Sequence, residues 1–235
     1  MSAIFKRELK SYFTSPIGYA ALAIILFLAG DAFHMIMYYG VADLSYVYSN
    51  MLTFVLLLVL PILTMRLLSD EKRQKTDQAL FTAPVSLGGI VVGKYLAALL
   101  LFVIGVSITL VFAVVLAAAG AEVNWMHTVG NYLGLLMLGG VIITIGLLIS
   151  SLTENQFIAA LGTFLVSLSM LMIDSIASMT TNSVVIAVVN FLSVNARYNN
   201  FTSGVIQYDD IIFFLSMQAL FLFLTVRIMD RKRWN

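Results

Sequence analysis

The chain has 235 residues, of which 61% are hydrophobic and only 11% are charged, and its formal net charge at pH 7 is +1. Soluble domains carry about 25% charged residues, and a water-soluble fold of this size could not bury so much apolar surface. Composition therefore predicts an integral membrane protein. The small net charge offers no general attraction to nucleic acid. The absence of cysteine excludes disulfides, thiolate metal ligands and cysteine catalysis.

The N-terminal segment, residues 2–14, is expected to form an amphipathic helix at the inner membrane surface. Its apolar residues recur at helical spacing and its basic residues fill the other face. The functional residues assigned to this interfacial helix are Phe5, Lys6, Arg7, Glu8 and Lys10. Ser15 and Pro16 then separate it from the first span. Two interpretations remain open: a topology anchor, or a lever that carries the motion of a partner into span one.

Six segments are long and apolar enough to cross a bilayer, since about 20 residues rising about 1.5 Å each cover about 30 Å. They are residues 17–39, 47–68, 89–118, 130–151, 156–176 and 210–229. The first follows basic residues as a signal peptide would, but it is too long for a cleaved apolar region, so we expect a retained span. The predicted fold is an all-α integral membrane protein with one domain over residues 1–235.

The region between spans five and six is less regular. Residues 183–193 are apolar but only half a span long, and we expect a short re-entrant or interfacial helix on the outer face. The asparagines that follow, including Asn195, Asn199 and Asn200, are expected to mark a polar loop.

Lysine and arginine collect before span one, around the loop between spans two and three, and at the end of span six. Of the thirteen, only Arg197 lies elsewhere, between spans five and six. The loops at residues 40–46 and 119–129 have neither residue type. Because inner loops are enriched in positive charge, both termini are expected in the cytoplasm. The predicted location is the bacterial plasma (inner) membrane, with the chain crossing it several times.

The polar island at residues 66–86 is the strongest candidate for a functional contact. It packs charges of both signs closely, which suits docking to a soluble protein more than attraction to lipid. Leu80 and Phe81 precede Pro84, so a short helix with an apolar knob could enter a groove in a partner. The alternative is a solvated charged loop. The residues assigned to the contact are Arg66, Asp70, Glu71, Lys72, Arg73, Thr76, Asp77, Leu80, Phe81, Thr82 and Pro84.

Three ionisable residues fall within or near the spans, namely Asp31, His34 and Asp174. Such groups are costly at depth and often functional. The favoured alternative is that span one is nearly complete at Asp31 and His34, so that both reach the outer headgroups. Glycines of span four, among them Gly139 and Gly146, are expected to serve packing within one subunit, with a dimer seam as the alternative.

The order of residues across the polar island resembles the ABC-2 class of ABC-transporter permeases. The similar stretch runs Arg66…Asp70-Glu-Lys-Arg73…Thr76…Leu80-Phe-Thr-Ala-Pro-Val-Ser86…Val92-Gly-Lys-Tyr95. Residues 5–19, 150–156 and 195–209 are also similar, most closely to the gliding-motility-type branch. The resemblance implies a separate ATP-binding cassette ATPase, with two permeases and two ATPases in the working unit. It also implies that residues 69–88 form the coupling helix and residues 2–14 the interfacial helix.

The chain departs from the family pattern at two positions of this stretch. Lys75 stands where the family often has glycine, and Gln78 stands where it often has glutamate. The second change puts in question an ion pair between that glutamate and the ATPase. Asp77 would point about 100° away from it on a helix.

Enzyme motifs are absent from the sequence. It has no G-x-x-x-x-G-K-[ST] loop, no G-x-S-x-G and no H-E-x-x-H, so ATP and Mg²⁺ are expected in the partner ATPase and no cofactor in this chain. The leading hypothesis is a permease subunit of an exporter, paired with a second permease copy or a homologous one. The alternative is a non-transporting scaffold that couples an ATPase to an envelope or motility process. An intramembrane enzyme is disfavoured because its ionisable residues are scattered.

Overall fold

A computed structural model describes residues 2–41, 43–75, 86–179, 182, 184, 186, 189 and 193–233. Every regular element among these residues is a helix, which confirms the predicted all-α class. The helices are α1 (Ser2–Thr14), α2 (Pro16–Tyr39), α3 (Ser45–Phe54), a π-helical turn η1 (Val55–Val59), α4 (Leu60–Thr64), α5 (Arg66–Arg73), α7 (Leu87–Val106), α8 (Ile108–Ala118), α9 (Trp125–Leu152), α10 (Gln156–Met179), α12 (Val194–Thr202) and α13 (Tyr208–Arg233).

Six of the described helical segments are long and apolar enough to cross a membrane, as predicted. They are Pro16–Tyr39, Ser45–Arg73, Leu87–Ala118, Trp125–Leu152, Gln156–Ser175 and Tyr208–Arg231. The protein is therefore a multi-pass membrane protein. The second span differs most from its predicted limits, because α5 continues it beyond residue 68 into the charged stretch that ends at Arg73.

Local capping explains where span one begins and ends. The Ser15 hydroxyl accepts a hydrogen bond from the backbone N–H of Ile17 at 3.3 Å, and Pro16 occupies the first turn, where its missing N–H costs nothing. The helix ends at Gly40, whose φ of 65° is a left-handed conformation that glycine adopts without strain.

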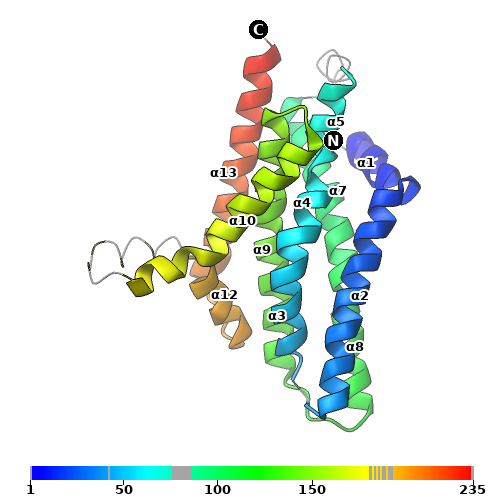
Figure 1. Cartoon of the computed structure of the whole chain (residues 1–235), viewed down its shortest axis with the longest axis vertical. Coiled ribbons are helices and arrows are strands. Elements are labelled where there is room, and N and C mark those ends of the chain that lie inside the picture. The colour runs from blue at the N-terminus through cyan, green and yellow to red at the C-terminus, as the bar shows by residue number, and fades with distance from the viewer. Residues whose placement is uncertain are drawn as a thin grey trace.

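The two termini lie at the same end of the bundle (Figure 1). That end, here named the basic end, carries α1, α5 and the end of α13 with Arg231, while the α2–α3 and α8–α9 connections lie at the opposite end. An even number of spans requires this arrangement. This arrangement brings the basic residues of α1, α5 and α13 to one end of the bundle.

Helix α9 forms the centre of the bundle and packs against α4, α7, α10, α12 and α13. Its glycines allow these close approaches: a Cβ on Gly139 would lie 2.2 Å from the Phe102 ring, and one on Gly146 would lie 2.1 Å from the Thr64 hydroxyl. Both neighbours belong to this chain, so the predicted packing role within one subunit is confirmed at these two positions.

The second span contains a π-helical turn directly before Pro61. The backbone N–H of Leu60 donates to the Val55 carbonyl, five residues back, instead of the usual four. Proline lacks an N–H and its ring crowds the preceding turn, and the wider π turn accommodates this. Span two is therefore helical throughout but has an irregular segment at its middle.

The region after span five corrects one prediction. The residues expected to form a polar loop around Asn195 and Asn199 are helix α12. The Ser193 hydroxyl caps it by accepting from the Ala196 N–H at 2.9 Å, and the Tyr198 ring lies against Gly134 of α9. Tertiary packing thus overrides the low helix preference of asparagine. The re-entrant helix predicted at residues 183–193 lies mostly outside the described residues and stays a prediction.

Candidate coupling site

Helix α1 is fastened to the start of span one and to span two at the basic end. The Tyr12 hydroxyl donates to the Leu63 carbonyl at 3.3 Å, and Arg66 lies 5.3 Å from the centre of the Tyr12 ring. Arg66 also donates to the Ser15 hydroxyl at 2.8 Å. A Cβ on Gly18 would lie only 2.1 Å from the Tyr12 carbonyl oxygen, so this close turn between α1 and α2 requires glycine.

Four charged residues from three helices meet between α1, α5 and α7. The Lys94 amine lies 3.1 Å from Glu8 Oε1 and 2.9 Å from Glu71 Oε1. The Arg7 guanidinium lies 2.6 Å and 2.8 Å from the same two oxygens. We name these four residues, Arg7, Glu8, Glu71 and Lys94, the Lys94 cluster. It joins the interfacial helix α1 to spans two and three.

The Lys94 cluster is mostly buried, which makes its charges interdependent. The Lys94 side chain is only 2% exposed, whereas Arg7 remains half exposed. Burial works against ionised Glu8, but the charges of Lys94 and Arg7 and their hydrogen bonds outweigh it, so the pKa of Glu8 lies below its ordinary value. The hydrogen bond that Arg7 donates to Glu8 is the main cause that raises the pKa of Arg7. Removing one partner would leave a buried charge without compensation.

Helix α5 is also bonded to the last turns of α9. The Ser150 hydroxyl accepts from the backbone N–H groups of Leu68 at 3.0 Å and Ser69 at 2.9 Å, and it donates to the Met65 carbonyl at 3.1 Å. These bonds satisfy backbone groups at the junction where α4 ends and α5 begins. Span four therefore caps the first turn of α5.

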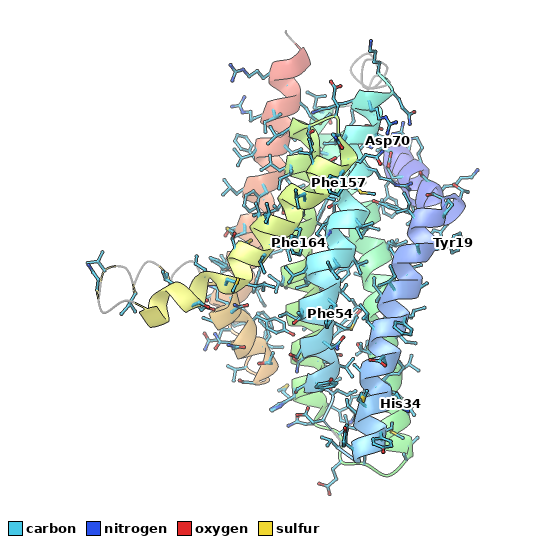
Figure 2. The ribbon with its side chains drawn as sticks, viewed as in Figure 1. Tyr19, His34, Phe54, Asp70, Phe157 and Phe164 are labelled. Carbon is cyan, nitrogen blue, oxygen red and sulfur yellow. The ribbon has the colours of Figure 1, made fainter. Side chains whose placement is uncertain are left out.

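Two charged residues of α5 continue this attachment toward span five. Gln156 donates to a carboxylate oxygen of Asp70 at 2.9 Å, and the Lys72 amine donates to the Ser151 carbonyl. In Figure 2, Asp70 of α5 and Phe157 of α10 both lie toward the basic end. Helix α5 is thus held by α1 and α7 on one side and by α9 and α10 on the other.

The structure brings five residues predicted from the sequence to the wall of one cavity, namely Arg7, Glu8, Arg66, Asp70 and Glu71. Within this set, Glu71 is ion-paired with Arg7. Phe5 packs against the core, and Lys6 and Lys10 are exposed. Arg73 lines a shallow cavity with Glu154 and Phe157. The remaining predicted contact residues, Thr76, Asp77, Leu80, Phe81, Thr82 and Pro84, lie outside the described residues and stay predictions.

The backbone at Lys75 has a conformation that favours glycine, the residue that the family often has at this position. It follows α5 with a φ of 55°, the single positive φ at a non-glycine position in the described part of the chain. A side chain in this left-handed conformation costs about 1–2 kcal/mol, which glycine avoids. Lysine in place of glycine therefore leaves the turn intact but adds backbone strain directly after α5.

Sequence reasoning missed three residues that organise this site: Lys94, Ser150 and Gln156. In the sequence, Lys94 indicates orientation and belongs to the family-like stretch that ends at Tyr95, but has no predicted contact role. The available signal was its position, since it stands in the second turn of an apolar helix and so needs a partner. Ser150 and Gln156 lie in the family-like stretch 150–156, but their residue types give no sign of a bond to α5, because a polar residue near a helix end is ordinary.

The three ionisable residues predicted near the spans are not brought together. Asp31 and His34 are exposed on α2, and the His34 ring lies 6.3 Å from that of Tyr38. Figure 2 shows His34 at the end opposite Asp70. Asp174 lies apart from them, on α10 beside α12. Among the described residues, no group of three His, Cys, Asp or Glu side chains could hold a metal ion.

Comparison with known proteins identifies the family. The sequence matches the family described as ABC-2 family transporter protein over residues 9–169, which is more than half of the chain and extends from α1 into α10. A search of curated proteins found no match. The family match does not distinguish branches, so the gliding-motility-type assignment stays a prediction. The chain belongs to the ABC-2 family of transporter proteins and is a permease subunit of an ABC transporter.

Proposed function

We propose that this permease couples a separate ATP-binding cassette ATPase to movement of its transmembrane helices, and that the complex works as an exporter. The observation that carries the proposal is the position of α5. This helix is the first part of the polar island, ahead of residues 76–85, and it is bonded to α1 and α7 through the Lys94 cluster and to α9 through Ser150. A partner that displaces the polar island would therefore move α5 together with its neighbours.

The path from α5 into the membrane supports a mechanical role. Helices α5, α4, η1 and α3 follow one another in a single span, so a displacement of α5 reaches the π-helical turn at Val55–Val59. A π turn is a place where helical hydrogen-bond register can shift. The basic half of span two would thus move with α1 and α7, while α3 keeps its contacts in the other half.

The proposed partners follow from the sequence and the family. No phosphate-binding loop is present in this chain, so ATP and Mg²⁺ would bind in the partner ATPase and the permease itself would not be an enzyme. The working unit would hold two permease subunits and two ATPases, because the family resemblance implies that stoichiometry.

The proposed orientation places the basic end in the cytoplasm of a bacterium, with the chain in the inner membrane. The positive-inside rule supports it. The chain contains no cysteine, so single cysteines can report sidedness. In intact spheroplasts, a membrane-impermeant maleimide should label Glu122→Cys and leave Lys10→Cys unlabelled until the membrane is opened. Labelling of Lys10→Cys in sealed spheroplasts would refute this orientation.

The coupling itself is tested on the complex purified from its native membrane in mild detergent. We expect an ATP-binding subunit to co-elute near one-to-one, identified by mass spectrometry. Glu71→Lys should lower either the yield of this complex or its ATPase activity by at least about tenfold, because it places a second cation against buried Lys94. Asp209→Asn, which removes an exposed carboxylate of α13 outside the cluster, should behave like the wild type.

Two results would overturn the proposal. The first is a permease that elutes without an ATPase at every salt concentration. The second is a Glu71→Lys complex with normal yield and normal ATPase activity. ATP-dependent movement of cargo in vesicles then separates an exporter from a scaffold that uses the same ATPase without transport.

A further inference from the structure

A polar cavity lies away from the Lys94 cluster, between α3, α9, α10 and α12. Its volume is about 540 Å³, and eight of its nine described lining residues carry a polar group. They include Ser49, Asn131, Asp174, Asn195 and Tyr198. Figure 1 shows α12 beside α9, in the half of the bundle opposite α1 and α5. A polar cavity is unexpected in a chain so rich in apolar residues, and its size is that of a small-molecule site.

Three side-chain hydrogen-bond donors of this cavity are in use. The Asn131 amide donates to the His127 carbonyl at 2.8 Å, and the Asn195 amide donates to the Leu171 carbonyl at 2.6 Å. The Thr202 hydroxyl donates to the Asn199 carbonyl at 2.8 Å. Each amide that donates in this way leaves its oxygen as an acceptor. The amide oxygens of Asn131 and Asn195, together with the hydroxyl oxygens of Ser45 and Ser49, can therefore accept hydrogen bonds from a ligand.

The charge of the cavity points the same way. Asp174 is the one ionisable acid or base among the described lining residues besides the Tyr198 phenol, and no described cation forms a salt bridge with it. Arg197, on the same helix as Tyr198, is engaged by Asp210 at 3.0 Å. An acceptor-rich site with one carboxylate and no cation favours a ligand that donates hydrogen bonds and is positively charged.

Tyr198 forms part of the cavity wall, but its hydroxyl is not a ligand contact. The residue is only 6% exposed, and the hydroxyl oxygen itself is fully buried, so a ligand in the cavity does not reach it.

We propose that this cavity binds a primary ammonium group, with Asp174 as the counter-charge and the amide oxygens of Asn131 and Asn195 as further acceptors. An ammonium carries three donors and one positive charge, which matches this lining. A bare metal ion would not fill about 540 Å³. The group can come from an amine headgroup of the membrane or from a soluble amine. The inference goes beyond coupling, since binding needs neither ATP nor a partner.

The test is equilibrium binding of a fluorescent primary amine, dansylcadaverine, to the full-length permease in phosphatidylglycerol nanodiscs. The uncharged N-acetyl derivative is the matched probe. We expect the amine to bind at least about tenfold tighter than its N-acetyl derivative, because charge-assisted hydrogen bonds are lost on acetylation. Asp174→Asn should weaken amine binding by a similar factor and leave the N-acetyl derivative unaffected.

A control variant keeps the result interpretable. Asp209→Asn removes an exposed carboxylate outside the cavity and should leave the dissociation constant unchanged. Equal binding of the two probes to the wild-type permease, or unchanged amine affinity in Asp174→Asn, would overturn the proposal.

A second arm identifies the source of the amine. Phosphatidylethanolamine added to the nanodiscs should weaken dansylcadaverine binding if a membrane headgroup occupies the site. Unchanged binding together with displacement by ethanolamine would assign the site to a soluble amine. Both results support ammonium recognition. Because ATP is absent from this assay, failure of the coupling proposal cannot cause its failure.

Discussion

The amine of Lys94 in α7 lies 2.9 Å from the carboxylate of Glu71 in α5, and its side chain is 2% exposed. This pair is the direct link between span three and α5, the first part of the polar island. Glu8 and Arg7 extend it to α1. A lysine inside an apolar helix is tolerated here because two carboxylates meet it.

Lys94→Met should destabilise the protein by about 3 kcal/mol, because it leaves two carboxylates close together without their buried cation. Glu71→Gln should also destabilise it, and the double variant should recover part of the loss. Thermal unfolding in detergent, analysed as a double-mutant cycle, measures the coupling between the two residues. Strictly additive effects would show that the pair makes no net contribution.

Stability should fall at acidic pH through Glu8. Its pKa is lower in the folded state than its ordinary value of 4.5, so its contribution is complete above that value and is lost as pH falls through the lower folded pKa. The unfolding temperature of the wild type should therefore drop below about pH 4.5. Glu8→Gln should be less stable at neutral pH and show a flatter profile in the acidic range. Parallel profiles for both proteins would contradict this assignment.

Ser150→Ala should cost about 1–2 kcal/mol, since two backbone N–H groups of α5 lose their acceptor at a buried junction. Ser169→Ala is the matched control, because the Ser169 hydroxyl is exposed and bonds only within α10. Thermal unfolding of the two variants compares them directly. If α5 transmits motion as proposed, Ser150→Ala should also lower ATPase stimulation in the complex. Equal unfolding temperatures for the two variants would remove Ser150 from the site.

Lys75→Gly should stabilise the turn after α5 by up to about 1 kcal/mol, because glycine adopts a φ of 55° without steric strain. The same substitution at Lys6, in the middle of α1, should instead cost about 1 kcal/mol. The opposite signs separate a conformational effect from loss of a positive charge. Destabilisation by both substitutions would contradict the left-handed turn.

Gly139→Ala should destabilise the bundle by about 1–3 kcal/mol, because the new methyl group would overlap the Phe102 ring between α9 and α7. Gly30→Ala, on α2, meets nothing within 4 Å and should leave the stability of the isolated subunit unchanged or slightly raised. Thermal unfolding of the purified subunit distinguishes them. A neutral Gly139→Ala would mean that α7 and α9 pack less closely than described.

Several features of the fold are local and were therefore predictable. Each span corresponds to a run of about 20 apolar residues, because the bilayer thickness alone sets that length. Lysine and arginine mark one end of the bundle, because they are costly to move across the membrane. The amphipathic pattern of residues 2–14 predicted α1, whose buried residues Ile4 and Tyr12 are eight positions apart on one helical face.

Other features depend on which helices become neighbours, and only the tertiary structure decided them. Lys94 and Glu8 are 86 positions apart, and nothing local in either helix indicates that they pair. The Ser150 cap of α5, the helix formed by the asparagines of α12 and the cavity beside Asp174 have the same origin. Hydropathy and charge determine that a segment crosses the membrane, but polar contacts between helices depend on side-chain directions that emerge only when the bundle is packed.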